Sequence, residues 1–576
     1  MKKISRMTAA FAAAALSAGT CTAGAAQVPA FRAEETYAPH GMVAAAHPLA
    51  VQAGVEILKQ GGNAVDAAAA VSLALNVVEF NASGIGGGGY MTIRRASDGR
   101  TVCLNYREMA PASAAKDMFA SEKARSEHWS SQGGLSVAVP GLLKGIEYAL
   151  ENYGTMTLGQ TAAPAIRLAE QGFELAPLQH GYIADNYDAL VQYNDPEKIR
   201  LLEDELPLEA GQTLKQPELA AAFRLIAGQG ADAFYKGPIG EAVCRAVNAA
   251  GGRMTMDDLA AYRVSVTEPV EGTYRGYRIC SMPPSSSGGT HVIQLLNIME
   301  NFDVKALGKD TPEFACVFAD ACRHVFADQA KYMADPEFVD IPLKGLMSRE
   351  YAKKTAALIT GTPARKAEAG DPWEFNGSAG DKKAYRGGMS PEQMSTTSFS
   401  VVDAEGNMVT ATNTINYFLG SKVLVPEYGF FLNNQMNDFS KDPQSVNAPE
   451  PRKRPLSSMS PTIVSTPDGR PFMSVGAAGS KMIITTVAQI IMNAVDFGME
   501  MDEAIEQCRI HCDSDSTVLV DKNRADPGLV RGLTEKGWQV SGERLLGAAQ
   551  GIRVDPQTGM KDGGADSRRL GTAAGW

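Results

Sequence analysis

Apolar and small residues recur at helical spacing near the beginning of the chain. The pattern runs from Met42 to Val78 and is interrupted once, by Gly61-Gly62-Asn63. We therefore expect two helices separated by this break. The second helix is rich in alanine, which favours a buried position.

A glycine run at residues 84–89 is followed by a different pattern. Residues 90–94, Tyr-Met-Thr-Ile-Arg, have the composition of a strand. A phosphate-binding glycine loop leads into a helix, so that its backbone N–H groups point at the phosphates. The order of elements here argues against a nucleotide site.

The middle of the chain, residues 140–358, is predicted to be mostly helical. Candidate buried positions are Ala149, Ala220, Val243 and Leu296, and residues 283–289 form a Pro-Ser-Gly turn. Residues 361–394 are polar and rich in Gly, Pro and charge. Such a composition buries little, so we expect a surface loop that ends just before Thr396.

From Thr396 onward the pattern changes to strands. Side chains alternate along residues 396–402, a turn follows at 403–407, and residues 408–413 return as the second strand of a hairpin. Residues 473–475 predict another strand, which leads through Gly476-Ala477-Ala478-Gly479-Ser480 into an apolar helix ending near Phe497. A glycine turn before a helix presents free backbone N–H groups, which can hold an oxyanion.

Composition removes one class of partner and indicates export. Hydrophobic residues make up 44% of the 576 residues, and the net charge of −11 leaves no basic excess for a nucleic acid. Residues 1–25 combine Lys2, Lys3 and Arg6 with an apolar run and a small-residue end, which predicts a secretory signal peptide and a periplasmic or secreted protein. A lipid anchor at Cys21 is the alternative. We expect no membrane span after the signal.

The cysteines and histidines do not predict a metal site or a cofactor. Seven cysteines follow the signal, without the doublets of a zinc site or the density of a disulfide scaffold. Cys508 and Cys512 can share a helix face, but only His511 lies close to them in sequence. We therefore expect a protein without a structural metal.

Three motifs in order identify a family resemblance. Ser395-Thr396-Thr397-Ser398-Phe399-Ser400, Asn433-Asn434-Gln435-Met436-Asn437-Asp438-Phe439 and Pro455-Leu456-Ser457-Ser458-Met459-Ser460-Pro461 resemble the gamma-glutamyltransferases. Upstream, Tyr106-Arg107-Glu108-Met109-Ala110-Pro111, Phe234-Tyr235-Lys236-Gly237-Pro238-Ile239 and Ser281-Met282-Pro283-Pro284 resemble landmarks of the same family. The resemblance covers nearly all of the chain after the signal.

The resemblance implies an α+β fold, the four-layer αββα sandwich of the N-terminal nucleophile hydrolases. It is completed when the chain cuts itself before Thr396, giving a large subunit of residues 26–395 and a small catalytic subunit of residues 396–576 that stay together as a heterodimer. The new α-amine titrates near neutrality and can accept the proton of the threonine hydroxyl. No catalytic histidine, metal or other cofactor is then needed.

Further residue roles are implied by position in the motifs. Arg107, Ser457 and Ser458 would hold the α-carboxylate of a gamma-glutamyl group, and Asn416, Gln435 and Asp438 its α-amine. Thr414 would support the nucleophile, and the backbone amides of Gly479 and Ser480 would form the oxyanion hole. Taken singly, the same residues fit ordinary structure: a surface ion pair for Arg107, a turn for Ser457-Ser458, a helix cap for Asp438 and a strand residue for Thr414.

Two positions depart from the family pattern. Ser398 stands where histidine is common, which can change the rate of self-cleavage, and Ser480 stands where a second glycine is common. Oxyanion donors are backbone groups, so serine can serve if its dihedral angles permit.

The implied function is a gamma-glutamyltransferase and glutathione hydrolase, which passes the gamma-glutamyl group of glutathione or a related donor to water, an amino acid or a peptide. Alternatives are a cephalosporin (glutaryl) acylase of the same family and an uncleaved exported binding protein. Between the amine-binding and Pro-Leu-Ser-Ser motifs lie only residues 440–454, none of them aromatic. The resemblance implies that family members with a lid carry a longer segment here, so we expect an open site. The alternative is that another loop, such as the one before Thr396, covers the site.

Overall fold

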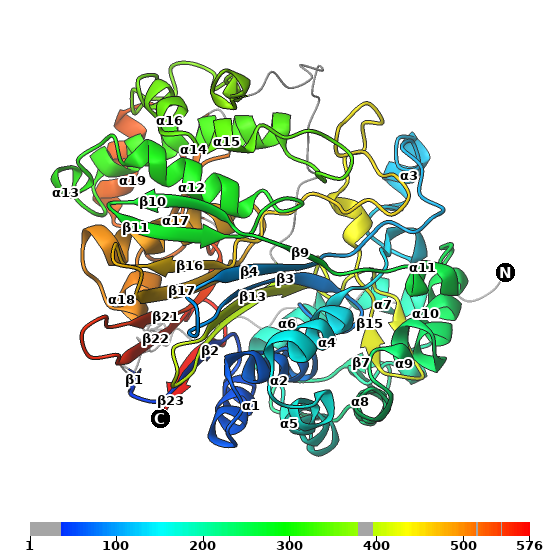
Figure 1. Cartoon of the computed structure of the whole chain (residues 1–576). Coiled ribbons are helices and arrows are strands. Elements are labelled where there is room, and N and C mark those ends of the chain that lie inside the picture. Colours follow the sequence, from blue (N-terminus) through cyan, green and yellow to red (C-terminus); the bar gives the residue numbers. More distant parts are fainter. Residues whose placement is uncertain (1–35, 378–394, 514–515, 543) are drawn as a thin grey trace, which may run out of the picture. The chain divides into compact units, whose positions relative to one another are not determined.

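Two seven-stranded sheets form the centre of the computed structural model, which describes residues 36–377, 395–513, 516–542 and 544–576 (Figure 1). Residues 1–25 with Cys21, and residues 378–394 of the polar loop, lie outside the described residues. The predictions for them stay predictions.

The first sheet joins strands from both ends of the chain. Its order is β1-β22-β21-β17-β16-β11-β10, and all neighbours are antiparallel. The strands are β1 (Thr36–Ala38), β22 (Lys561–Ala565), β21 (Ala548–Val554), β17 (Pro471–Ala478), β16 (Thr462–Ser465), β11 (Tyr277–Ser281) and β10 (Val270–Tyr274).

The second sheet is also antiparallel throughout, in the order β23-β2-β12-β13-β3-β4-β9. Its strand β12 contacts β17 and β21 of the first sheet, so the two sheets face each other. The strands are β23 (Thr572–Gly575), β2 (Met42–Ala45), β12 (Thr397–Val402), β13 (Met408–Thr414), β3 (Gly88–Arg94), β4 (Thr101–Tyr106) and β9 (Ser265–Thr267).

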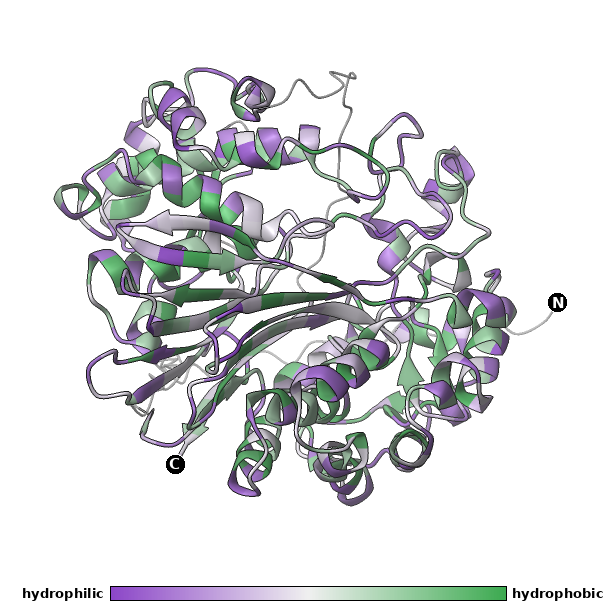
Figure 2. Cartoon of the chain, in the orientation of Figure 1, coloured by the Kyte–Doolittle hydropathy of each residue, from purple (hydrophilic) through white to green (hydrophobic). Residues whose placement is uncertain are grey.

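Helices cover the outer face of each sheet. α2 (Ala64–Val78) contacts β12 and β13, and α1 (Pro48–Lys59) contacts α2. On the other side, α12 (Gly288–Met299) contacts β10, and α17 (Met482–Asp496) contacts β17. The peripheral helices in Figure 2 carry both hydrophobic and hydrophilic residues, as expected for helices with one buried face.

The remaining elements surround this centre. The helices are α3 (Glu122–Ser126), α4 (Leu142–Tyr153), α5 (Leu158–Gln171), α6 (Pro177–Ala184), α7 (Tyr187–Tyr193), α8 (Pro217–Gln229), α9 (Asp232–Tyr235), α10 (Pro238–Ala249), α11 (Met256–Ala260), α13 (Val304–Leu307), α14 (Pro312–Tyr332), α15 (Leu343–Leu346), α16 (Arg349–Ala356), α18 (Met501–Glu506) and α19 (Pro527–Glu535). Short strands are β5 (Phe173–Glu174), β6 (Leu202–Glu203), β7 (Leu206–Pro207), β8 (Thr213–Leu214), β14 (Leu424–Val425), β15 (Phe430–Phe431), β18 (Ile510–His511), β19 (Thr517–Val520) and β20 (Gln539–Ser541), and the 3₁₀ turns are η1 (Gly134–Ser136), η2 (Pro196–Lys198), η3 (Pro372–Phe375) and η4 (Gln435–Asp438). A fold of helices and antiparallel sheets is confirmed.

The predicted break and alanine-rich helix are confirmed, and the start of α2 shows why. The Asn63 side chain accepts hydrogen bonds from the N–H groups of Val65 and Asp66, while Asp66 accepts one from Asn63 N–H. This capping box satisfies N–H groups that a helix start leaves unpaired. All fifteen residues of α2 are buried, so small alanines let it pack closely on β12 and β13.

Three expectations need correction. Residues 42–45 form strand β2 between β12 and β23, where a helix was expected. The middle region is mostly helical but includes the β10–β11 hairpin. The loop from Gly361 is not entirely superficial, because Trp373 is buried beside Tyr351 and Leu456.

Among the described residues, no helix has both the length and the apolar character required to cross a bilayer. The same part of the chain contains no group of three or more His, Cys, Asp or Glu residues placed to hold a metal ion.

Candidate active site

Thr396 lies at the start of β12, beside the end of β13. The register pairs Thr397 with Asn413, which puts Thr396 next to Thr414. The Oγ1 atoms of Thr396 and Thr414 are 3.0 Å apart. The backbone N–H of Asn416 donates to Thr414 Oγ1 at 2.8 Å and so fixes this hydroxyl beside that of Thr396.

The backbone of Thr396 has an unusual conformation. Its φ is 85°, a region that β-branched residues rarely adopt and that costs about 1–3 kcal/mol. Arg569 Nη1 donates to the carbonyl oxygen of Thr396 at 2.6 Å, which helps to hold this conformation. The peptide bond that precedes Thr396 therefore adjoins a strained residue.

Asp438 is the centre of a buried polar cluster. It accepts hydrogen bonds from Gln435 Nε2 at 2.6 Å and from Asn416 Nδ2 at 3.1 Å, and it forms an ion pair with Arg107. Burial raises the pKa of Asp438, and the Arg107 guanidinium opposes that rise. The structure thus brings together three residues predicted to bind an α-amine and the arginine predicted to bind an α-carboxylate.

Arg107 also contacts the segment that contains Ser457 and Ser458. Its Nη2 donates to the carbonyl of Leu456 at 3.1 Å, immediately before Ser457 and Ser458. Its side chain is buried, so the surface ion-pair reading of Arg107 is wrong. Ser457 forms a parallel bridge with Ser286, and its Oγ accepts from the backbone N–H of Met459 at 3.2 Å.

The turn between β17 and α17 contains the two predicted oxyanion residues. Gly479 has φ 130° and Ser480 has φ 61°, both in the region where side chains are disfavoured. A Cβ at Gly476, earlier in β17, would lie 2.3 Å from Ser398 Oγ. This close approach packs the strand leading into the turn against the strand that begins beside Thr396.

Ser398, where the family commonly has histidine, points into this tight space between the sheets. Its Oγ donates to the carbonyl of Ala411 at 3.2 Å. The hydroxyl is therefore satisfied within the β12–β13 pair.

Sequence reasoning missed three residues at the site. Arg569 contacts Thr396, Gln329 Nε2 donates to Ser458 Oγ at 3.3 Å, and Glu108 lies 3.8 Å from Arg107 Nη1. Burial raises the pKa of Glu108 to about 7. The sequence could have indicated only Glu108, which stands next to Arg107. The contacts of Arg569 and Gln329 join segments far apart in the chain.

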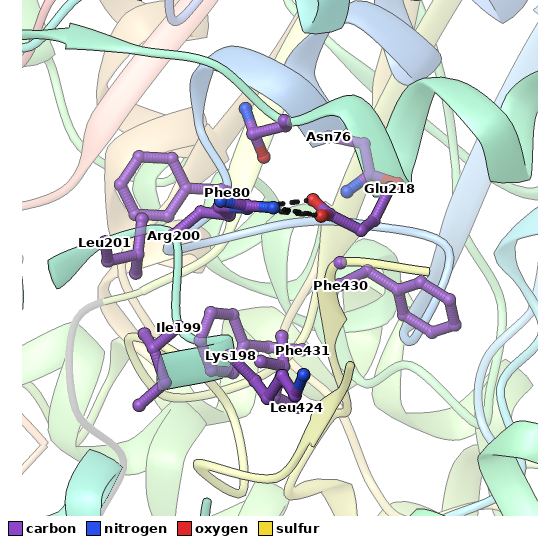
Figure 3. Close-up of a pocket in the computed structure, with 12 residues that line it drawn as sticks. Asn76, Phe80, Lys198, Ile199, Arg200, Leu201, Glu218, Leu424, Phe430 and Phe431 are labelled. Carbon is purple, nitrogen blue, oxygen red and sulfur yellow. Dashed lines mark hydrogen bonds and ion pairs between the residues drawn. The ribbon is translucent and has the colours of Figure 1, made fainter. Parts of the chain in front are cut away.

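A pocket elsewhere in the molecule contains none of these groups (Figure 3). Its volume is about 20 Å³, room for little more than one water molecule. Arg200 and Glu218 are paired across it. Its lining includes Phe80, Leu424, Phe430 and Phe431. The Thr396 cluster is therefore the candidate active site.

A family model described as gamma-glutamyltranspeptidase matches residues 50–576. The chain belongs to the gamma-glutamyltranspeptidase family. It is an enzyme of this family, and the resemblance inferred from the sequence is confirmed.

Curated gamma-glutamyltranspeptidase relatives match over most of their length. A glutathione hydrolase proenzyme of Bacillus subtilis is 39% identical over 93% of this chain and 91% of the relative. The glutathione hydrolase proenzyme of Escherichia coli is 38% identical over 97% of both chains. An acylase ACY 1 proenzyme of a Pseudomonas species is 37% identical over 92% of this chain and 93% of the relative.

Solved structures of related enzymes superpose on this chain. A cephalosporin acylase from Bacillus halodurans superposes with a TM-score of 0.84 at 28% identity, covering 95% of this chain and 97% of that one. The gamma-glutamyltranspeptidase of Helicobacter pylori has a TM-score of 0.53 at 37% identity, covering 58% of this chain and 95% of that chain.

Proposed function

We propose that the chain is a gamma-glutamyltransferase and glutathione hydrolase that cuts itself before Thr396. The observation that carries the proposal is one connected series of contacts. The hydroxyl groups of Thr396 and Thr414 are hydrogen-bonded, and the backbone N–H of Asn416 donates to Thr414. The Asn416 side chain donates to Asp438, which forms an ion pair with Arg107. A nucleophile is thereby linked to a carboxylate and a guanidinium, the groups that recognise an ammonium and a carboxylate.

In this proposal the two facing sheets and their outer helices are the four-layer αββα sandwich of the N-terminal nucleophile hydrolases. The cut leaves residues 26–395 and 396–576 as the two subunits, and Thr396 as a new N-terminus. Strands from both sides of the cut pair within each sheet, which supports a stable heterodimer.

The catalytic cycle then follows from the residues. The hydroxyl of Thr396 attacks the γ-carbonyl of the donor while its own α-amine, with an ordinary pKa near 8, accepts the proton. The C–N bond of the γ-amide breaks, its nitrogen takes that proton and leaves as the amine of the released product, and a gamma-glutamyl ester remains on Thr396. The backbone N–H groups of Gly479 and Ser480 would stabilise the oxyanion in each step. Water or an amino acid then resolves the ester.

Denaturing gels test the self-cleavage directly. The wild-type protein should give bands of about 39 and about 19 kDa, in proportion to the 61.1 kDa chain. Thr396→Ala should give one uncut band, whereas the neighbouring control Thr397→Ala should be cut. A wild type that stays uncut would support an exported binding protein instead, and normal cutting of Thr396→Ala would move the nucleophile elsewhere.

The acylase relatives make a glutaryl donor the second candidate function. A glutaryl group has the terminal carboxylate but lacks the α-amine of a gamma-glutamyl group. The cluster of Asn416, Gln435 and Asp438 favours the donor with the amine, because these side chains offer an ammonium a carboxylate and two amide oxygens, whereas a glutaryl group has no cation to place there. Comparing kcat/KM for glutathione and for a glutaryl amide decides between them, and faster turnover of the glutaryl amide would reverse the assignment.

An open site is a further part of the proposal. Within residues 440–454, Asn447 Nδ2 donates to the carbonyl of Asp438 at 2.8 Å and Asn447 Oδ1 accepts from Leu456 N–H at 3.1 Å. The segment is thus tied to both motifs that it connects, which leaves little chain to cover a substrate. We expect activity on long gamma-linked polyglutamate as well as on glutathione, and a high share of hydrolysis. Activity confined to the small donor would contradict the open site.

Export is the remaining proposal, and it rests on residues 1–25 alone. Amino-terminal sequencing of protein recovered outside the cytoplasm should find that these residues have been removed. A protein that retains them with a lipid on Cys21 would support the anchor.

A further inference from the structure

The guanidinium of Arg569 lies against the bond that the proposed self-cleavage breaks. Its Nη1 donates to the carbonyl oxygen of Thr396 at 2.6 Å, and its Nη2 lies 3.5 Å from the carbonyl oxygen of Ser395. The Ser395 carbonyl is the one that Thr396 Oγ1 must attack. Arg569 belongs to none of the three family motifs noted above, and it precedes β23 at the far end of the chain.

Arg569 is held in this place from two sides. Its Nη1 is 3.5 Å from Oε1 of Glu79, a buried carboxylate that follows the end of α2. Its guanidinium carbon lies 5.7 Å from the ring centre of Phe418, which stacks on Tyr182. The side chain is only 9% exposed. A charge fixed in a partly dry site acts more strongly on a neighbouring charge than it would in water.

We propose that Arg569 binds the carbonyl oxygen of Ser395 while that oxygen carries negative charge during self-cleavage. This inference rests on the proposed cut before Thr396. Thr396 Oγ1 forms a bond to the carbonyl carbon of Ser395, the C–N bond to Thr396 breaks, and the hydroxyl proton ends on the freed amine. Water then hydrolyses the resulting ester, giving the Ser395 carboxyl group and restoring the Thr396 hydroxyl.

Arginine suits this task because it keeps its charge at every physiological pH. Its planar fork can also serve two acceptors at once. One nitrogen holds the Thr396 carbonyl, which does not react, and fixes the guanidinium. The other nitrogen is then directed at the oxygen whose charge changes. Glu79 is a positioning residue, since it acts on the reacting carbonyl through its ion pair with Arg569.

The test measures cleavage rates of the full chain made by cell-free synthesis, with fragments followed on a denaturing gel after translation is stopped. Arg569→Met should slow cleavage by about 10²–10³-fold, the effect of removing one oxyanion donor. Glu79→Gln, which is nearly isosteric, should slow it less. Added guanidinium ion should accelerate cleavage of Arg569→Ala, which a merely structural role would not allow. Arg531→Met, at an exposed position on α19, is the matched control and should be cut at the wild-type rate.

Melting temperatures are measured on the same proteins. A folded Arg569→Met chain that is cut as fast as wild type overturns the inference. If Arg569→Met does not fold, the Glu79→Gln chain decides: cleavage of this variant at the wild-type rate overturns the inference. The proposed function is checked separately. A wild-type chain that is never cut contradicts that function. A wild-type chain that is cut, together with Arg569 and Glu79 variants that are cut equally fast, contradicts only the role of Arg569.

Discussion

Arg107 is already engaged before any substrate binds. It pairs with Asp438 and donates to Leu456, and both partners lie at the predicted donor site. In the proposed function, a donor α-carboxylate would share the guanidinium with Asp438. A planar group with several donors can do this, whereas an ammonium has no such fork.

We predict that Arg107→Lys is cut normally before Thr396 but binds its donor weakly. Losing a hydrogen bond to a charged group costs about 1.5–3 kcal/mol, which is roughly 10- to 150-fold in KM. Steady-state kinetics with glutathione measure this change. Arg245→Lys, at an exposed ion pair with Glu427, is the control and should behave as wild type. An unchanged KM, or a chain that stays uncut, would remove Arg107 from the carboxylate site.

Gln329 supports Ser458 from α14. Its Nε2 donates to Ser287 Oγ at 2.7 Å and to Ser458 Oγ at 3.3 Å. Gln329→Leu leaves both hydroxyls without this donor, so we expect KM for the donor to rise by about 5- to 10-fold, the equivalent of one ordinary hydrogen bond, with little change in self-cleavage. Gln557→Leu, on the exposed surface, is the control. A change in cleavage without a change in KM would assign Gln329 to folding.

The residues predicted from sequence and those that were missed differ in one physical respect. Thr396, Asp438 and Ser457 stand in contiguous motifs, so the local sequence identifies them. Arg569 and Gln329 reach the site through contacts across more than a hundred residues. No local pattern records such a contact, because the fold alone determines which distant side chains meet.

At the scale of elements, the turn between β17 and α17 offers a matched pair of substitutions. A Cβ at Gly479 would lie 2.8 Å from the Cα of Gly547, and its φ of 130° disfavours any side chain. Gly479→Ala should therefore shift the oxyanion amides and lower kcat by about 10²-fold or more. Ser480→Gly should keep kcat, because glycine tolerates φ 61° better than serine. Equal kcat in wild type and Gly479→Ala would place the oxyanion hole elsewhere.

The loop that carries Asn416 contains a buried lysine whose titration affects stability. Burial lowers the pKa of Lys422 from 10.5 to about 7, and its Nζ donates to the carbonyl of Phe418. Between about pH 7 and 10.5 the unfolded chain binds this proton and the folded chain does not. The free energy of unfolding therefore rises with pH across this window.

We predict that Lys422→Met removes this rise. Chemical denaturation from pH 7 to pH 10 should show wild type gaining stability relative to the variant. Lys353→Met, an exposed lysine on α16, should follow wild type at every pH. Parallel curves for wild type and Lys422→Met would mean that Lys422 is charged in the folded protein.

The prediction of elements was wrong where burial on both faces removes the alternation of apolar and polar residues. Residues 42–45 are apolar on both faces because β2 lies inside a sheet and beneath α1, and such a strand looks like part of a buried helix. The hairpin from β12 to β13 was predicted correctly, because its turn at residues 403–407 is polar. Sheet order could not be predicted, since it depends on pairings between distant strands.

At the scale of the whole molecule, both sheets are shared between the two sides of the proposed cut. β12 pairs with β2 and β13 with β3 in one sheet, and β16 pairs with β11 in the other. Separating the fragments would break these pairings and expose unpaired backbone groups along the separated strands. Association should therefore survive cleavage.

We predict that the two fragments elute together in size-exclusion chromatography and separate only in denaturant. Thr396→Ala, uncut, should elute at the same volume and serves as the reference. Fragments that separate in native buffer would contradict the shared sheets.

The distance between Thr396 and Arg569 along the chain has a consequence for the timing of the proposed self-cleavage. Arg569 follows Thr396 by 173 residues. A ribosome adds about 5–20 residues per second, so the guanidinium is made roughly 10–35 s after the threonine. A chain stopped in this interval carries the proposed nucleophile but lacks the guanidinium proposed to bind the Ser395 carbonyl oxygen. If both proposals hold, self-cleavage would act as a check on complete synthesis, because unfinished chains would be cut slowly.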